Sequence, residues 1–344
     1  MYYPQQQQQS NYMHITKENH MEKLHDILST RREHDSLGEQ DIIERYIKPL
    51  NPTPMYQKTG EVAAYCVKVK HKDGTPSTTL WSCHTDTMHR GNPETTRQEV
   101  YVDVFGVMFV DEGAGCLGAD NGAGMWLLLE MIQAGVPGTY MFHRGEEKSC
   151  WGSRGVVEHY PEFLAEHTHA IAFDRKGTTS VITHQMGGRA CSDDLGEALC
   201  ALFGDDYILD TTGVYTDTAE YVDIIPECVN VSIGYMNEHS SNESLDSAHC
   251  VALRDRIIAI NWDSIELPVA RDPSDERYEM GQTWGNGWSS TTMNLAPSIE
   301  DALLWSDVDV DEWMEYCEPA EASWMVSDLL DEVRALRNDR DFRH

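Results

Sequence analysis

Short apolar runs that lead into a histidine or an acidic residue recur along this chain, and they constrain its fold more than any other feature. Each run has the length and composition of a buried β-strand, and the runs occupy residues 78–83, 139–143, 169–173 and 228–235. Helical periodicity is found at residues 122–133, 193–203 and 243–261. This alternation predicts an α/β fold in which a mixed central β-sheet is flanked by helices. The polar residues at the strand ends should gather at one sheet edge, where open α/β sheets bind ligands.

The chain is strongly acidic, which narrows its possible partners. Its 344 residues include 26 Lys and Arg against 58 Asp and Glu, so the formal net charge is −32. Nucleic acids and anionic membrane surfaces attract clustered Lys and Arg, so both are disfavoured as partners. The longest apolar stretch, near residues 125–132, is too short to span a bilayer. No secretory signal is visible at the N-terminus, and we expect a cytoplasmic protein.

Composition divides the chain into four parts. Residues 1–17 form a Gln-rich lead that we expect to be flexible, and residues 18–267 carry the α/β pattern. Residues 268–298 have the composition of a linker. Residues 299–344 form an acidic segment with interleaved tryptophans, which we interpret as a helical extension. This extension is either a solvated appendage or a docking segment for a basic partner.

The first two chemical signals are a His-x-Asp pair and an acid beside a glycine-rich turn. His84 and Asp86 are two residues apart, so an extended backbone points both side chains to one side. An imidazole can bind a metal ion while a nearby carboxylate fixes its orientation. Asp120 precedes a helix, and its two oxygens could bridge two cations or only cap that helix. Each signal alone is weak.

Further carboxylates and a second histidine follow the later strands. Glu146 and Glu147 are adjacent, so their side chains should face opposite ways, one towards a metal and one towards a substrate as a proton shuttle. Asp174 ends the run at 169–173, and His239 follows the last run. Carboxylate and imidazole ligands without a thiolate suit Zn²⁺, Mn²⁺ or Co²⁺. Together these residues predict a site for two divalent cations.

The order and spacing of these segments resemble the co-catalytic zinc exopeptidases of the M28/M20/M42 clan. The matching motifs are SCHTDT at 82–87, LGADNGAG at 117–124, GEE at 145–147, AFD at 172–174, TDTAEY with IP at 216–226, and EHS at 238–240. The resemblance implies that His84 and Asp174 hold one metal, most simply zinc. It also implies that Glu147 and His239 hold the other, and that Asp120 bridges the two.

The resemblance also assigns the remaining catalytic roles within residues 18–267. Glu146 would act as the general base, Asp86 would orient His84, and a hydroxide shared by the metals would attack the peptide bond. The clan often has a cis peptide after its bridging acid, here Asp120. The segment before His239 is too short for the dimerisation domain that M20 enzymes insert, so the pattern favours an M28-type aminopeptidase without that domain.

Two other functions remain open at this point. One is a related amidohydrolase of the carboxypeptidase or deacylase type, and the other is a catalytically silent scaffold that still binds metal. Arg175, Lys176 and Arg154 lie near the motifs and could bind a substrate carboxylate or only balance charge. Asp217 is expected near the metals, and His184 lies in a loop that could line the substrate pocket. We expect a peptide substrate.

Overall fold

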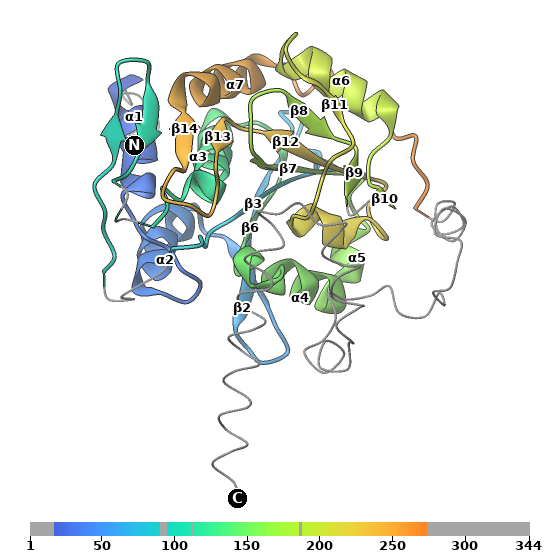
Figure 1. The fold of residues 1–344 in the computed structure, drawn as a ribbon. Coiled ribbons are helices and arrows are strands. Elements are labelled where there is room, and N and C mark those ends of the chain that lie inside the picture. The colour runs from blue at the N-terminus through green and yellow to red at the C-terminus, as the bar shows by residue number, and fades with distance from the viewer. Residues whose placement is uncertain (1–16, 90–94, 112, 114, 186–187, 274–344) are drawn as a thin grey trace, which may run out of the picture. The chain divides into compact units, whose positions relative to one another are not determined.

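A central sheet of eight strands organises the described part of the chain (Figure 1). The computed structural model describes residues 17–273 except 90–94, 112, 114 and 186–187. In spatial order the strands are β1 (Thr53–Tyr56), β2 (Val62–Val69), β6 (Gly138–His143), β3 (Thr79–His84), β7 (His169–Arg175), β12 (Glu227–Ser232), β8 (Ser180–Ile182) and β11 (Ile208–Asp210). The predicted mixed central sheet is confirmed.

The four central strands of this sheet are parallel. β3 lies between β6 and β7 and runs parallel to both, and β7 runs parallel to β12. The outer pairs β1–β2, β2–β6 and β12–β8 are antiparallel. In the β3–β6 pair, His84 lies opposite His143. The carboxyl ends of the central strands therefore reach the same edge of the sheet, and the segments that follow them meet there.

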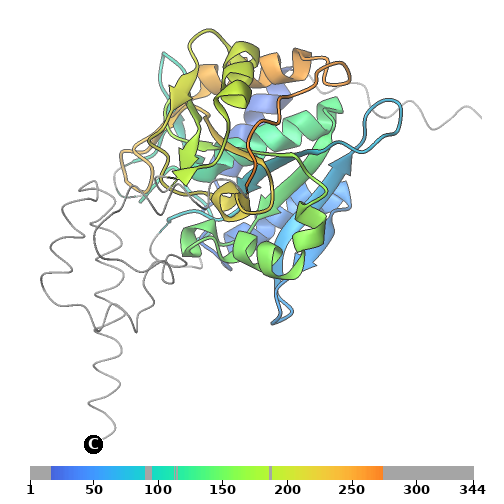
Figure 2. The ribbon, with the colours of Figure 1, turned by 90° about the vertical axis from the view of Figure 1, so that its right-hand side faces the viewer.

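Helices cover both faces of the sheet (Figures 1 and 2). On one face are α1 (Lys17–Leu28), α3 (Ala119–Ala134), α6 (Asp193–Phe203) and α7 (Ser247–Ala259). On the other are α4 (Trp151–His159), α5 (Pro161–Leu164) and the 3-10 helix η5 (Asp217–Tyr221). Side chains alternate between the two cores, since Trp81 packs with the first set and Leu80 with the second.

The remaining elements are short. A second sheet contains β13 (Tyr235–Met236), β14 (Ser244–Asp246), β5 (Val107–Phe109) and β4 (Tyr101–Val102), and β9 (His184–Gln185) pairs with β10 (Gly188–Arg189). The N-terminal part continues after α1 as α2 (Leu37–Ile42), the π-helical turn η1 (Ile43–Ile47) and the 3-10 turn η2 (Lys48–Leu50). The 3-10 turn η4 (Glu146–Lys148) follows β6.

Two differences from the sequence analysis have local causes. The predicted helix 243–261 begins only at Ser247, because residues 244–246 pair with β5 as β14 and Asp246 then caps the helix by accepting from His249 N at 2.9 Å. Helix α4 was not predicted, because its two glycines weaken the helical pattern.

Most of the predicted lead, most of the predicted linker and the whole acidic extension lie outside the described residues. The last residue of the predicted lead, Lys17, is the first residue of α1. In the part that the structure describes, no helix is both long and apolar enough to cross a membrane. The segment between Asp174 and His239 folds onto the same architecture, since β8, β11 and β12 are strands of the central sheet. No separate domain is inserted between these two residues in the described part of the chain.

Candidate metal centre

The carboxyl end of β3 places His84 at the middle of the site. Its side chain is 1% exposed, and its Nε2 lies 3.0 Å from Asp120 Oδ1 and 3.4 Å from Asp174 Oδ1. The other ring nitrogen, Nδ1, lies 3.1 Å from the backbone oxygen of Asp86. A proton on Nδ1 would donate to that oxygen and leave Nε2 free to bind a metal ion.

The Asp86 carboxylate also forms hydrogen bonds that the sequence analysis did not predict. Its carboxylate accepts hydrogen bonds from Glu146 N at 3.1 Å and from Glu147 N at 3.3 Å. The Asp86 carboxylate is farther from His84 Nδ1, at 3.5 Å, than the backbone oxygen is. Asp86 thus contacts His84 mainly through its backbone and fixes the two glutamates through its side chain.

Asp120 lies between the two histidines. Its Oδ1 faces His84, and its Oδ2 lies 3.2 Å from His239 Nε2. The Asp120–Asn121 peptide bond is cis, as the motif resemblance implies. The turn before α3 is held by Glu243, which accepts from Gly118 N at 2.8 Å and Asp120 N at 3.0 Å.

Glu147 and Glu146 occupy different positions at the end of β6. Glu147 has a side chain that is 4% exposed, and its Oε1 lies 3.0 Å from His239 Nε2. Glu146 lies farther from the imidazoles, with Oε2 3.9 Å from His84 Nε2, and 15% of its side chain is exposed. His239 follows β13 and is the most open of the predicted ligands, with 27% of its side chain exposed.

Asp174 ends the apolar part of β7 and is oriented from three sides. Its Oδ2 accepts from Thr216 Oγ1 at 2.6 Å, and its backbone N donates to Asn230 Oδ1 at 2.9 Å. Asn121 Nδ2 donates to its Oδ1. The TDTAEY motif therefore contributes Thr216 to the setting of this carboxylate.

The three residues predicted to bind substrate each contact residues other than the predicted metal ligands. Asp217 is 1% exposed, and its Oδ2 lies 3.3 Å from His143 Nδ1. Arg175 donates to Thr212 Oγ1 at 3.0 Å. His184 lies on β9, where its Nδ1 is 2.9 Å from Thr183 Oγ1. Substrate contact by these three residues stays a prediction.

The electrostatics show an excess of negative charge at the centre. Burial lowers the pKa of His239, but the carboxylates of Glu147 and Asp120 outweigh it and raise the pKa to about 12. Burial likewise opposes protonation of His84, whose pKa the carboxylates of Asp174 and Asp120 still raise well above its usual range. Burial raises the pKa of Glu146 well above its usual range; the charge of Asp174 adds to this shift, and His84 opposes it. Such a site attracts cations.

The donors form two overlapping groups that could hold metal ions. Potential ligand atoms lie within 4.8 Å of one another in the group His84, Asp120 and Asp174, and again in the group Asp120, Glu147 and His239. Asp120 belongs to both groups and faces each with a different oxygen. Imidazole and carboxylate donors of this kind suit Zn²⁺, Mn²⁺ or Co²⁺. The geometry thus brings together all five residues proposed as ligands, and their assignment to individual metals stays a prediction.

The sequence analysis missed several charged residues that support the site. Arg32 is fully buried, and it donates to the backbone oxygens of Thr85 at 3.1 Å and Gly118 at 2.7 Å. Glu243 had a detectable signal, because it lies only three residues after the EHS motif. Arg32 had none, since its partners are backbone atoms. Both residues hold turns that carry predicted metal ligands.

Comparisons with known proteins support the fold. No protein-family model matches the sequence, and no curated protein matches it. Among solved structures, aminopeptidase PepT from Bacillus cereus is similar over 72% of this chain and 99% of its own, with a TM-score of 0.58 and 12% identity. A tripeptidase from Staphylococcus aureus is similar over 71% and 97%, with a TM-score of 0.55 and 12% identity.

A third similar structure is a TET aminopeptidase from a marine sediment archaeon of the Thaumarchaeota. It covers 70% of this chain and 95% of its own, with a TM-score of 0.53 and 12% identity. The chain therefore has the fold of these peptidases, and the fold expected from the motif resemblance is confirmed. At this level of identity the comparison establishes the architecture, and activity has to be argued from the site.

Proposed function

We propose that this protein is a dinuclear-metal-dependent aminopeptidase of the co-catalytic exopeptidase clan. The observation that carries the proposal is the pair of three-residue donor groups that share Asp120, with Glu146 beside them. The order of the motifs and the fold shared with aminopeptidases support it. The substrate is a peptide, cleaved at its N-terminal peptide bond.

In this proposal each ligand has a defined place. His84 and Asp174 hold one cation, Glu147 and His239 hold the other, and Asp120 contacts both. When bound, such a pair of divalent cations lowers the pKa of a shared water towards neutrality and polarises the scissile carbonyl group. Zinc is the simplest choice for these donors, and Mn²⁺ and Co²⁺ accept the same ligands.

Glu146 is the proposed general base. Burial and the neighbouring carboxylates raise the pKa of Glu146, which makes its carboxylate a stronger base than that of an exposed glutamate. It would take a proton from the attacking water and return it to the leaving amine. Its backbone is fixed by Asp86, and Cys150 Sγ lies 3.7 Å from its Oε1. The partial exposure of its side chain gives water access to the carboxylate.

The basic residues near the site argue against recognition of a free substrate carboxylate. Arg154 Nε lies 2.8 Å from Glu220 Oε1, and Lys176 Nζ lies 2.9 Å from Glu238 Oε1. Arg175 donates to Thr212 and lies 3.8 Å from Asp210. Each of these cations already pairs with a residue of the protein, so binding a substrate carboxylate would require that pair to be broken. This disfavours the carboxypeptidase and deacylase alternatives.

The test combines metal removal with a substrate panel. Chelation should abolish hydrolysis of aminoacyl-anilides and short peptides, and Zn²⁺, Mn²⁺ or Co²⁺ should restore it. N-acyl amino acids should not be cleaved under any of these conditions. Full activity in excess chelator, with the metal shown to be absent by elemental analysis, would contradict the proposal. Cleavage of N-acyl amino acids alone would favour the amidohydrolase, and metal binding without any hydrolysis would favour the silent scaffold.

A further inference from the structure

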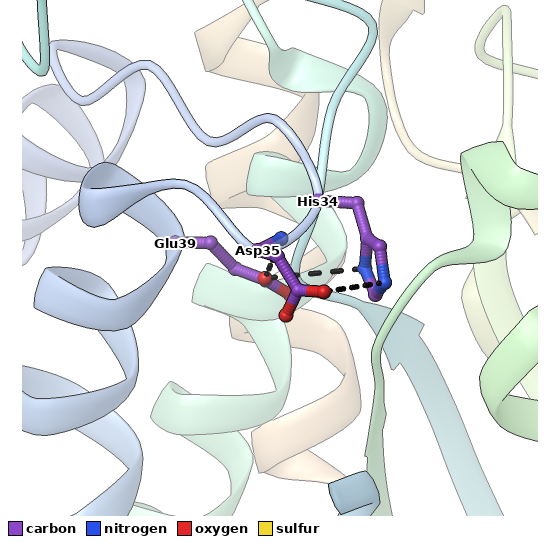
Figure 3. Close-up of side chains that lie close together, drawn as sticks. All are labelled: His34, Asp35 and Glu39. Carbon is purple, nitrogen blue, oxygen red and sulfur yellow. Dashed lines mark hydrogen bonds and ion pairs between the residues drawn. The ribbon is translucent and has the colours of Figure 1, made fainter. Parts of the chain in front are cut away.

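A second cluster of titratable side chains lies on α2 and on the connection that precedes it. It contains His34, Asp35 and Glu39, whose potential ligand atoms lie within 4.8 Å of one another (Figure 3). Arg144 already supplies positive charge here, since it forms an ion pair with Asp35 and its Nη2 lies 2.7 Å from Glu39 Oε2. The Arg144 guanidinium therefore supplies the positive charge of this cluster, and the contacts of Glu39 indicate the function of the cluster.

Glu39 is fully buried, and both of its oxygens are used by donors from separate segments. Oε2 accepts from Arg144 Nη2 at 2.7 Å and from Asp35 N at 2.8 Å. Oε1 accepts from Arg144 Nε at 3.1 Å and from Thr85 Oγ1 at 2.7 Å. A buried carboxylate is tolerated only when such partners compensate its lost hydration, and removal of one partner is costly.

The partners of Glu39 are neighbours of proposed catalytic and metal-binding residues. Thr85 lies between His84 and Asp86, and its backbone N also donates to His143 O at 2.9 Å. Arg144 is two residues before Glu146. The Glu39 carboxylate therefore links the turn after β3 to the turn after β6 from the α2 side.

A different link joins the same two turns on the side of the metal centre. There the Asp86 carboxylate accepts from the backbone N atoms of Glu146 and Glu147. The backbone bond from Thr85 N to His143 O also joins these segments. Each further attachment restricts rotation of the two turns, and Glu39 adds one on the α2 side through Thr85 Oγ1 and Arg144 Nε.

We propose that Glu39 is a positioning residue, which acts through Thr85 and Arg144 to fix Glu146 and Glu147 relative to His84. This inference rests on the function proposed above. Residues that orient metal ligands in this way affect metal affinity or activity by about 10- to 100-fold when they are changed. Glu39 should therefore influence both metal binding and turnover, although it touches neither metal nor substrate.

Thr85 offers the sharpest test, because a single hydroxyl group can be removed from it. Thr85→Val keeps the size and branching of the side chain but removes the hydroxyl, which donates to Glu39 Oε1 at 2.7 Å and also lies 3.1 Å from His143 O. Thr85→Ser keeps this hydroxyl. We expect Thr85→Val to bind Co²⁺ about tenfold more weakly and to lower kcat about tenfold with KM unchanged. Thr85→Ser should recover most of both losses, and Glu39→Gln should resemble Thr85→Val or be more severe.

Co²⁺ binding is measured by calorimetry and by the visible absorption of the bound ion, at a temperature where circular dichroism shows the variants folded. Glu44→Gln is the matched control. Glu44 lies in the neighbouring η1 turn, its side chain is 61% exposed, and it forms an ion pair with the exposed Lys48. It should bind Co²⁺ and turn over like the wild type.

The inference is overturned if Thr85→Val binds Co²⁺ and turns over like the wild type, even when its melting temperature falls. A purely structural role would lower the melting temperature and leave the Co²⁺ spectrum unchanged. If Glu39→Gln does not fold, the comparison of Thr85→Val with Thr85→Ser still decides. A wild type that binds no Co²⁺ and cleaves no peptide would overturn the proposed function itself, which is a different result.

Discussion

Replacement of Glu146 by Gln separates the proposed base from the metal ligands. The amide keeps the size of the side chain, and the bond from residue 146 N to the Asp86 carboxylate is retained. Only the ability to take and return a proton is lost. Other carboxylates offer no substitute, because Glu147 contacts His239 and Asp217 is 1% exposed.

General acid–base catalysis contributes about 10²- to 10⁴-fold to rate. Because no substitute carboxylate is available, we expect a loss near the upper limit, about 10⁴-fold in kcat, or about 5 kcal/mol in activation free energy. The assay measures kcat on an aminoacyl-anilide together with metal content by elemental analysis. Both metals should remain bound in Glu146→Gln.

Glu147→Gln is the comparison variant. Its carboxylate is one of the donors in the group with Asp120 and His239, so this substitution should lower the metal content as well as the rate. Metal loss from Glu146→Gln, with full metal content in Glu147→Gln, would show that the two roles are exchanged. A fall in kcat of less than about tenfold in Glu146→Gln would refute its role as the base.

Two other predictions follow from the same geometry. The pKa of His239 is raised to about 12, and that of His84 also lies well above its usual range. Both imidazoles are therefore protonated at pH 7 before a cation binds. Metal binding should release these protons, and metal affinity should increase as the pH rises. Calorimetry in buffers of different ionisation enthalpy measures the number of protons released, and no release on metal binding would contradict this prediction. Gly124→Ala would place its Cβ 1.9 Å from Asn121 Oδ1 and 2.4 Å from Phe173 O. The free energy of unfolding in urea should therefore fall by about 1–3 kcal/mol. Gly113→Ala is the control, because a Cβ there meets open space, and it should change the free energy of unfolding little.

The meeting of the proposed ligands could be predicted because it depends on strand direction. Parallel strands present their carboxyl ends at one edge, so residues that follow β3, β6 and β7 had to lie close together once those strands were recognised. His84, Glu147 and Asp174 each follow or end a run of apolar residues. The position of Asp120 also followed from its place at the start of an apolar helix.

The sequence pattern predicted the wrong start for α7, because pairing with a distant segment makes the residues before this helix extended. Glu243 was taken as the first residue of a helix, but the residues after it pair with β5, and its buried carboxylate instead binds Gly118 N and Asp120 N. A strand of three residues has too few positions to show alternation. Only the approach of the β5 segment from elsewhere in the chain determines that these residues are extended.

The residues that hold the turns in place were missed for a more general physical reason. Arg32 donates to the backbone oxygens of Ile27, Thr30, Thr85 and Gly118, and any residue type at those positions would offer the same acceptor. Glu39 looks like an ordinary polar position in a short helix until Arg144 and Thr85 are placed beside it. A buried charge needs partners, but the sequence does not say which distant segment supplies them. Arg32 and Glu39 together contact the turns that carry His84, Asp120 and the two glutamates. The chain from residue 32 to residue 39 therefore holds the candidate metal centre in place.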